Sequence, residues 1–79
     1  MTVTVKLFAS LQQFLPAGST SRQVKLDVTE GSNVGHVLTG LGVPKQNAHL
    51  IMINGQQAGW DDVLNEGDTL SVFPPVAGG

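Results

Sequence analysis

Two segments of the chain alternate strictly between apolar and polar residues. In the first segment the apolar positions are Val3, Val5 and Leu7. In the second segment they are Val24, Leu26 and Val28. A period of two with a bias towards β-branched residues predicts a strand that buries one face. We therefore expect a first strand over residues 2–7 and a second over residues 24–29.

The stretch between these two strands, residues 9–22, is too long for a tight hairpin. Within it, apolar residues at helical spacing suggest a short helical turn that Ser10 begins and Pro16 ends. The apolar positions of that turn are Leu11, Phe14 and Leu15. Residues 17–21 are small and polar and are expected to form an exposed loop.

The clearest helical pattern follows the second strand. Its apolar positions are Val34, Val37, Leu38 and Leu41, spaced i, i+3, i+4 and i+7. Ser32 is the expected N-cap, Gly42 the expected C-terminal stop, and Pro44 prevents continuation. Interior Gly35 and Gly40 each cost about 1 kcal/mol relative to alanine, so we expect packing on a sheet to stabilise this helix.

The last third of the chain predicts three more strands. Residues 50–53 form a continuous apolar run, which is typical of a central strand covered on both faces. Asn54-Gly55 predicts a tight turn into a short edge strand over residues 56–58. Turns are expected at residues 59–62 and 66–68, and residues 69–73 make the last strand before two prolines. The order is β-β-α-β-(β)-β, which favours one mixed sheet packed on one helix; a ferredoxin-like fold would need a second full-length helix.

Composition narrows the function classes. The chain has 79 residues, ten glycines, no cysteine and a net charge of −2. A single small domain follows from the length, and disulfides, Fe–S clusters and cysteine-based zinc sites are excluded. No basic run suits nucleic acid, and no apolar stretch approaches the about 20 residues of a membrane span. We expect a cytoplasmic domain that binds neither nucleic acid nor a membrane.

Residue types that commonly serve in catalysis, metal binding or partner recognition are few in this chain. His36 and His49 lie thirteen positions apart in the sequence, which is a weak basis for a metal site. Adjacent Asp61 and Asp62 are typical of a solvated turn. The single tryptophan, Trp60, is either a partner anchor or, more often in a small domain, a lid on the core. No catalytic or metal-binding residues are predicted, so the domain itself does not look like an enzyme.

The last eleven residues carry no charged side chain, in contrast to ordinary solvated termini. Pro74 and Pro75 favour an extended segment beyond the last strand. Val76 and Ala77 follow, and Gly78 and Gly79 have no side chain. Two glycines alone would favour a frayed terminus. Together with the prolines, they instead predict a carboxylate on a thin stalk that can enter a narrow tunnel.

Residues 64–79 resemble the C-terminal signature of the MoaD/ThiS-type ubiquitin-like sulfur carriers, and the Phe-Pro-Pro-Val-x-Gly-Gly ending is closest to the small subunit of molybdopterin synthase. Residues 5–9, Glu30-Gly31 before the helix, and residues 53–55 also match. The resemblance implies an α+β, β-grasp (ubiquitin-like) fold with a mixed four- to five-stranded sheet on one main helix. Its last strand would pair in parallel with its first. The domain would span residues 1–73, with a flexible Gly-Gly tail over residues 74–79.

The resemblance also implies a non-enzymatic carrier. A ubiquitin-activating-like adenylyltransferase would adenylate the Gly79 carboxylate, and a persulfide would convert it to a thiocarboxylate. The sulfur would then pass to a pterin precursor on the molybdopterin synthase large subunit. Gly78, Ala77 and Val76 would allow passage into the partner, while Phe73, Pro74 and Pro75 would orient the tail. The carrier would bind no cofactor, because the activating partner uses the ATP.

Three alternatives remain open at this stage. The family includes thiamine-type sulfur carriers and protein modifiers that are conjugated through a terminal glycine such as Gly79. The chain could also be a plain β-grasp interaction module. Docking is expected on an exposed apolar patch of the open sheet face, for which Phe8, Met52 and Phe73 are candidates that could equally be core. The sequence reveals no charge complementarity to a partner.

Overall fold

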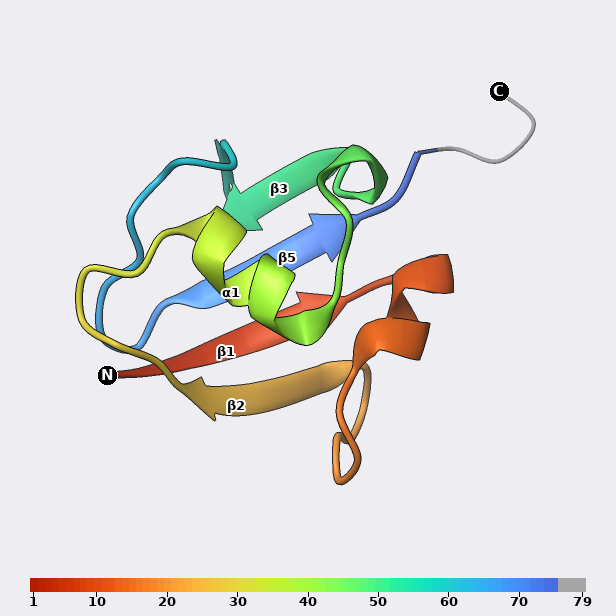
Figure 1. The fold of residues 1–79 in the computed structure, drawn as a ribbon, viewed down its shortest axis with the longest axis horizontal. Helices are drawn as coiled ribbons and strands as arrows, with labels where there is room; N and C mark the ends of the chain where they lie inside the picture. Colours follow the sequence, from red (N-terminus) through yellow and green to blue (C-terminus); the bar gives the residue numbers. More distant parts are fainter. Residues whose placement is uncertain (76–79) are drawn as a thin grey trace.

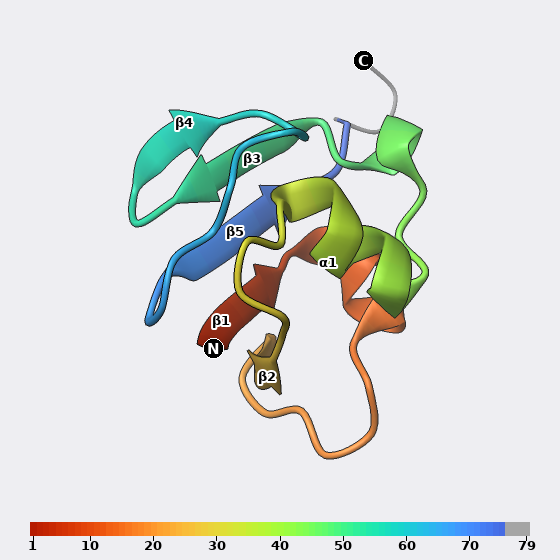
Figure 2. The ribbon, with the colours of Figure 1, turned by 60° about the vertical axis from the view of Figure 1, so that its left-hand side comes forward.

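The computed structural model describes residues 1–75 of the chain, and five strands within them form a single sheet. In chain order the elements are β1 (Thr2–Leu7), η1 (Ala9–Phe14), β2 (Gln23–Asp27), α1 (Val34–Leu41), η2 (Lys45–Asn47), β3 (Leu50–Ile53), β4 (Gln56–Ala58) and β5 (Thr69–Phe73). The helix α1 crosses one face of the sheet (Figure 1). Turning the molecule shows that the opposite face carries no helix (Figure 2).

The strand order is β2-β1-β5-β3-β4, so β5, the last strand, lies at the centre. It pairs in parallel with β1 and antiparallel with β3. The outer pairs, β1 with β2 and β3 with β4, are both antiparallel. This is the β-grasp fold, and it confirms the expected parallel pairing of the last strand with the first.

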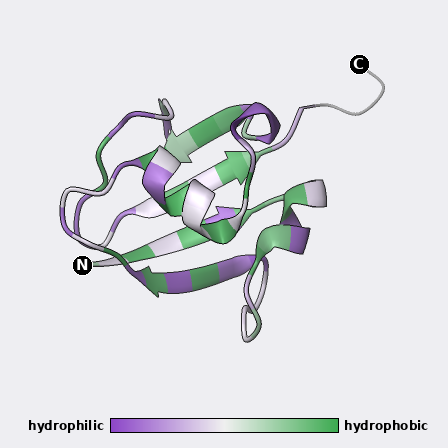
Figure 3. Cartoon of the chain, in the orientation of Figure 1, coloured by the Kyte–Doolittle hydropathy of each residue, from purple (hydrophilic) through white to green (hydrophobic). Residues whose placement is uncertain are grey.

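Alternation along the strands decides which residues form the core. On β1, Val3, Val5 and Leu7 are fully buried between sheet and helix, and Leu70 and Val72 of β5 lie beside them. Apolar side chains therefore gather between the two layers. In Figure 3, hydrophobic residues (green) alternate with more polar ones along the strands. The helix α1 contributes Val34, Val37 and Leu38, η1 contributes Leu11, and the loops contribute Val43 and Leu64.

The residues that alternate with the core residues along each strand occupy the open face of the sheet, the face without a helix. Thr4 of β1 lies opposite Thr69 of β5, and Lys6 lies opposite Ser71. Because this face is not covered by a helix, it is polar along most of its length. It becomes apolar at Leu50 and Met52 of β3 and where the next residues of the same parity on β1 and β5, Phe8 and Phe73, follow.

Side-chain hydrogen bonds concentrate at the end of the sheet where β1 begins. We call this the loop end: segments 27–33 and 59–68, together with the first turn of α1 against which they lie. The two segments are joined by the Asn33–Val63 bridge and by a Leu64 N–H that donates to Ser32 O at 2.9 Å. Asp68 is buried and accepts from Asn54 Nδ2 and from the Asn65 N–H, each at 2.8 Å.

Most elements predicted from the sequence are confirmed, with two wrong caps. The N-cap of α1 is Asn33, whose Oδ1 accepts from the His36 N–H at 2.8 Å. Ser32 instead donates its hydroxyl to Thr29 O, one residue outside the helix. Ser10 does not cap η1 either: Phe8 holds the N-cap position without a side-chain hydrogen bond, and Ser10 lies inside the turn.

Two further expectations need correction. The run 50–53 is not covered on both faces, because only Ile51 is buried while Leu50 and Met52 lie half-buried on the open face. The second strand ends at Asp27 rather than at Thr29.

Gly35 is more than a helix-weakening residue. A Cβ there would overlap Trp60 Nε1 and lie 2.7 Å from Trp60 Cε2. The missing side chain is what lets the indole pack on the helix. Trp60 accordingly covers the core, and its half-buried side chain packs against the buried residues. This is the role that the sequence analysis gave as the more frequent one for a single tryptophan in a small domain.

Candidate functional site

The end of the sheet opposite the loop end is built around two stacked phenylalanines. Because β1 and β5 run in parallel, both strands finish at this end, and Phe8 and Phe73 come to lie side by side on the open face. Their ring centroids are 4.3 Å apart and the rings are nearly parallel, at 9°. The Phe8 N–H donates to Val72 O at 3.2 Å, which continues the β1–β5 ladder into the pair. We call this the exit end, because the chain leaves the sheet here.

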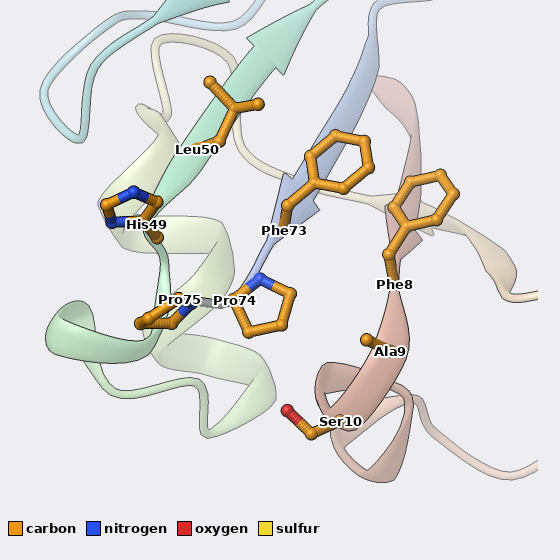
Figure 4. A pocket seen from close by; sticks show the side chains of 8 residues that line it. All are labelled: Phe8, Ala9, Ser10, His49, Leu50, Phe73, Pro74 and Pro75. Carbon is orange, nitrogen blue, oxygen red and sulfur yellow. The ribbon is translucent and has the colours of Figure 1, made fainter. Parts of the chain in front are cut away.

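An apolar groove of about 560 Å³ opens beside the stacked pair. Its lining residues are Phe8, Ala9, Ser10, His49, Leu50, Phe73, Pro74 and Pro75. In the close-up the phenylalanine rings stand next to each other, Leu50 lies on the far side of Phe73, and the prolines lie below (Figure 4). Leu50 pairs with Phe73 across β3 and β5, and the His49 N–H donates to Phe73 O at 3.0 Å. Backbone pairing therefore fixes this wall of the groove.

The facing wall is made by an unusual backbone position. Ala9 has φ +52°, in the left-handed region that costs an alanine about 1 kcal/mol or more. This conformation ends β1 abruptly and turns the chain into η1 directly after Phe8. Strained residues persist only where the surrounding structure determines them, and they are frequent at binding sites.

Two prolines determine how the chain departs. Pro74 is half-buried and Pro75 is exposed, and neither has an N–H with which to extend the ladder to a neighbouring strand. The chain therefore separates from β5 at the rim of the groove. The predicted passage and attachment residues, Val76, Ala77, Gly78 and Gly79, lie outside the residues that the structure describes.

The structure places two of the three predicted docking residues in the groove and the third outside it. Phe8 and Phe73 line the groove together, whereas Met52 lies opposite Ser71 on the open face and is not part of the lining. The sequence did not identify Ala9, Ser10, His49 or Leu50 as docking residues. The register of β3 against β5 places Leu50 there, and that pairing is not visible in the periodicity of either segment.

Metal chemistry finds no support at this end or elsewhere in residues 1–75. No group of three or more histidine, aspartate or glutamate side chains in that range is arranged to hold an ion. His36 is exposed on α1 and His49 is exposed ahead of β3, and neither belongs to such a group. Within the same residues, no helix is long and apolar enough to cross a membrane.

Known structures resemble the chain over nearly its whole length. Small archaeal modifier protein 1 of Haloferax volcanii is 30% identical, with a TM-score of 0.70, over 95% of this chain and 98% of that one. A candidate molybdopterin converting factor subunit 1 of Pyrococcus furiosus is 28% identical, with a TM-score of 0.70 and the same coverage. A chain in the Helicobacter pylori complex of molybdopterin-converting factor subunits 1 and 2 is 18% identical with a TM-score of 0.57, over 100% of both chains, and shows the fold alone.

Among curated proteins, none matches the chain. A family model does match: the one described as Mut7-C ubiquitin covers residues 1–78. The fold, the parallel β1–β5 pair and the whole-length similarity to an archaeal modifier all agree with that match. The chain therefore belongs to the Mut7-C ubiquitin family and is a small MoaD/ThiS-like ubiquitin-like protein of the sulfur carrier and modifier group.

Proposed function

We propose that the protein is a cytoplasmic sulfur carrier for molybdopterin biosynthesis, with Gly79 as the residue that holds the sulfur. The single observation that carries the proposal is the exit end. A strained, aromatic-lined groove lies where Pro74 and Pro75 direct the chain off the central strand, four residues before Gly79 in the sequence. A partner that covers the groove also reaches the segment that follows.

The proposed chemistry begins with a carboxylate, which is a poor acyl electrophile until it carries a good leaving group. An adenylyltransferase partner supplies ATP; the Gly79 carboxylate attacks the α-phosphate, pyrophosphate leaves, and an acyl adenylate forms. A persulfide sulfur then displaces AMP, and a thiol cleaves the resulting S–S bond to leave a thiocarboxylate and a new disulfide. The carrier binds no cofactor of its own in this scheme.

Each residue of the proposed site has a defined role. Gly78, together with the small residues Ala77 and Val76, permits passage into a narrow partner active site, since a bulky side chain would widen the segment. Phe73, Pro74 and Pro75 orient that segment relative to the groove. The receiving partner is the large subunit of molybdopterin synthase; the support is the Helicobacter pylori relative, which is seen in a complex of subunits 1 and 2.

Intact-mass analysis of the protein from its native host tests the proposal. It measures whether the chain ends in a free Gly79 carboxylate and whether a fraction has one oxygen exchanged for sulfur. Deleting Gly79 is expected to abolish sulfur loading and leave the thermal unfolding midpoint unchanged. The matched control is Gly40→Ala, which alters a glycine with open space around it and is expected to load normally. Loading of the Gly79 deletion variant would contradict the proposal.

A second candidate function is protein modification, and the similarity to small archaeal modifier protein 1 favours it. In that case the Gly79 carboxyl carbon forms an isopeptide bond to a lysine of another protein. Tryptic peptides that carry a Gly-Gly remnant on lysine, lost in a strain without this gene, would support modification. Detection of the thiocarboxylate without such peptides would support the carrier role and argue against protein modification.

A further inference from the structure

The Asn54-Gly55 dipeptide forms the turn between β3 and β4, a part of the molecule that the proposed function does not use. Ile53 pairs with Gln56, and φ is +52° at Asn54 and +82° at Gly55, as in a type I′ turn. Both turn residues are exposed. In Figure 2 the turn lies at the same end of the sheet as the start of β5. The turn is therefore open to water while it lies beside the entry to the central strand.

Asparagine followed by glycine is the dipeptide in which an amide side chain reacts most readily with the backbone. The glycine nitrogen attacks the asparagine Cγ, its proton passes to the leaving group, and ammonia departs from a five-membered succinimide. Water then opens the ring at either carbonyl, which leaves aspartate or isoaspartate. Glycine favours the attack because it has no side chain to hinder its nitrogen. Of the four asparagines in the chain, Asn54 alone precedes a glycine.

The nucleophile of this reaction, the Gly55 nitrogen, is accessible. Within residues 1–75, the Gly55 N–H donates to no other backbone group outside the regular strands and helices. A Cβ placed on Gly55 would meet no atom within 4 Å, so the space around it is open. Control over the reaction therefore lies with the Asn54 side chain rather than with the attacking nitrogen.

The electrophile, the Asn54 amide, is held at both of its polar atoms. Asn54 Nδ2 donates to Asp68 Oδ1, and Asn54 Oδ1 accepts from the Thr69 N–H, each at 2.8 Å. The Asn54 N–H also donates to Thr69 O at 2.9 Å. We call these three hydrogen bonds the Asn54 clamp. Asp68 is itself buried and fixed by the Asn65 N–H, so the clamp directs the amide towards the start of β5.

The backbone conformation at Asn54 also opposes ring closure. A left-handed residue has ψ of about +47°, which places its Cβ and the next nitrogen on opposite sides of the Cα–C bond. A succinimide needs these two atoms eclipsed, because its ring is nearly planar. The clamp must break and the turn must open before the Gly55 nitrogen can reach the Asn54 Cγ.

We propose that Asn54 is a deamidation site that the clamp keeps closed in the folded protein and that opening of the β3–β4 turn exposes. The position of the turn supports such opening, because β4 has only three residues and lies at the edge of the sheet. Short edge elements open locally at a lower free energy than central strands do. The reaction needs only water, so the inference goes beyond the proposed function and does not rest on it.

The product of deamidation cannot rebuild the clamp. An oxygen replaces Asn54 Nδ2, so two carboxylates face each other where Nδ2 and Asp68 Oδ1 now lie 2.8 Å apart. Like charges at this distance repel strongly, and Asp68 is buried. Isoaspartate also adds a methylene to the main chain of a two-residue turn. The step is irreversible, so the lifetime of the fold depends on how often the turn opens.

Peptide mapping by mass spectrometry measures the reaction at each asparagine. The full-length protein is incubated at neutral pH, folded in buffer and unfolded in guanidinium chloride. In the unfolded chain, aspartate and isoaspartate are expected at position 54 before any other asparagine reacts. In the folded protein, conversion of Asn54 is expected to be at least about tenfold slower. Equal rates in the two states, or faster conversion of Asn33, Asn47 or Asn65 in the unfolded chain, would overturn the proposal.

Two destabilised variants separate opening of the turn from unfolding of the whole domain. Asp68→Ala removes an acceptor of the clamp, whereas Gly35→Ala disturbs the contact with Trp60 and leaves the clamp in place. At a temperature where both variants are folded, Asp68→Ala is expected to speed conversion of Asn54 about tenfold and Gly35→Ala by less than about twofold. Rates that follow the free energy of unfolding instead would show that the turn does not open locally.

An exchange of side chains tests what the product costs. Asn54→Asp imitates the product and is expected to lower the Tm by about 10 °C, because two carboxylates then face each other. In the double variant Asn54→Asp/Asp68→Asn, the amide at position 68 donates to the carboxylate at position 54, and the Asn65 and Thr69 N–H groups keep their acceptors. Its Tm is expected to return to within about 3 °C of the starting protein. A double variant no more stable than Asn54→Asp would contradict the proposed effect of deamidation.

Discussion

The two ends of the sheet use their side chains in opposite ways. At the loop end, polar side chains are bonded inwards: Asp68 holds Asn54 and Asn65, and Asn33 caps α1. At the exit end, the aromatic side chains Phe8 and Phe73 lie half-buried against each other, and the groove beside them is apolar. The polar side chains of the loop end hold loops in place, whereas the aromatic side chains of the exit end remain available at the surface.

This difference separates stability from binding in the same small domain. A chain of this length has about 4–12 kcal/mol of stability in total, so the loops of the loop end need specific hydrogen bonds to stay ordered. The exit end is held by the ladder between β1 and β5 and by the His49–Phe73 backbone bond. Substitutions at the loop end should therefore lower stability, and substitutions at the exit end should lower partner binding.

The largest expected effect is a loss of stability when the contact between Gly35 of α1 and Trp60 is disturbed. Gly35→Ala places a Cβ into the Trp60 indole, which must move away from the helix. Overpacking of this kind costs about 3 kcal/mol, a large share of the total. Urea unfolding followed by tryptophan fluorescence measures it. Gly40→Ala, on the same helix with open space around it, is expected to gain up to about 1 kcal/mol. Equal effects at the two glycines would contradict the packing argument.

The next effect concerns the buried carboxylate. Asp68→Ala leaves Asn54 Nδ2 and the Asn65 N–H without their acceptor, and we expect a loss of about 2 kcal/mol. Asp61→Ala is the control, since Asp61 is exposed, and should change the free energy of unfolding by less than about 0.5 kcal/mol. The KM for the carrier in ATP–pyrophosphate exchange by the adenylyltransferase partner should be unchanged in both folded variants. A raised KM for Asp68→Ala at full folding would mean that the two ends are coupled.

The sequence predicted the framework well because its periods are strong. Strand alternation in β1, helical spacing in α1 and the Asn54-Gly55 turn each indicate one local structure, and the structure has them all. The N-cap was misplaced because Ser32 and Asn33 are both good caps, and only the backbone conformation decides between them. The packing role of Gly35 was not predicted because it depends on Trp60, which lies 25 positions away in the sequence.

The candidate site was predictable only in part, for a related reason. Phe8 and Phe73 could be named because the β-grasp pairing brings the ends of the first and last strands together. Leu50 and His49 needed the register of β3 against β5. Long-range pairing leaves little trace in a single sequence, so surfaces formed by it are what sequence patterns miss.

At the exit end, truncating the aromatic pair is expected to affect binding more than stability. Phe8→Ala removes the stacking partner of Phe73, and since both rings are half-buried we expect a loss of about 1 kcal/mol. The same variant should raise the KM for the carrier in ATP–pyrophosphate exchange by the adenylyltransferase partner at least about tenfold, because an aromatic side chain of the groove is gone. Met52→Ala, on the open face but outside the groove lining, is the control for partner binding. Equal increases for both variants would argue for a diffuse contact across the whole open face.

The smallest expected effect tests whether strain at the exit end serves the groove. Ala9→Gly relieves the left-handed conformation at φ +52°, but glycine also loses more backbone entropy on folding. The balance should stabilise the fold by only about 0.5 kcal/mol, seen as a slightly higher Tm. Ala17→Gly, at an exposed loop position without a positive φ, should instead destabilise by a similar amount. If the strained alanine preorganises the groove wall, Ala9→Gly should have a higher KM in the same exchange assay although it is the more stable protein. A variant that gains both stability and affinity would show that the strain at Ala9 contributes nothing to binding, and the contrast between the two ends would then rest on the aromatic pair alone.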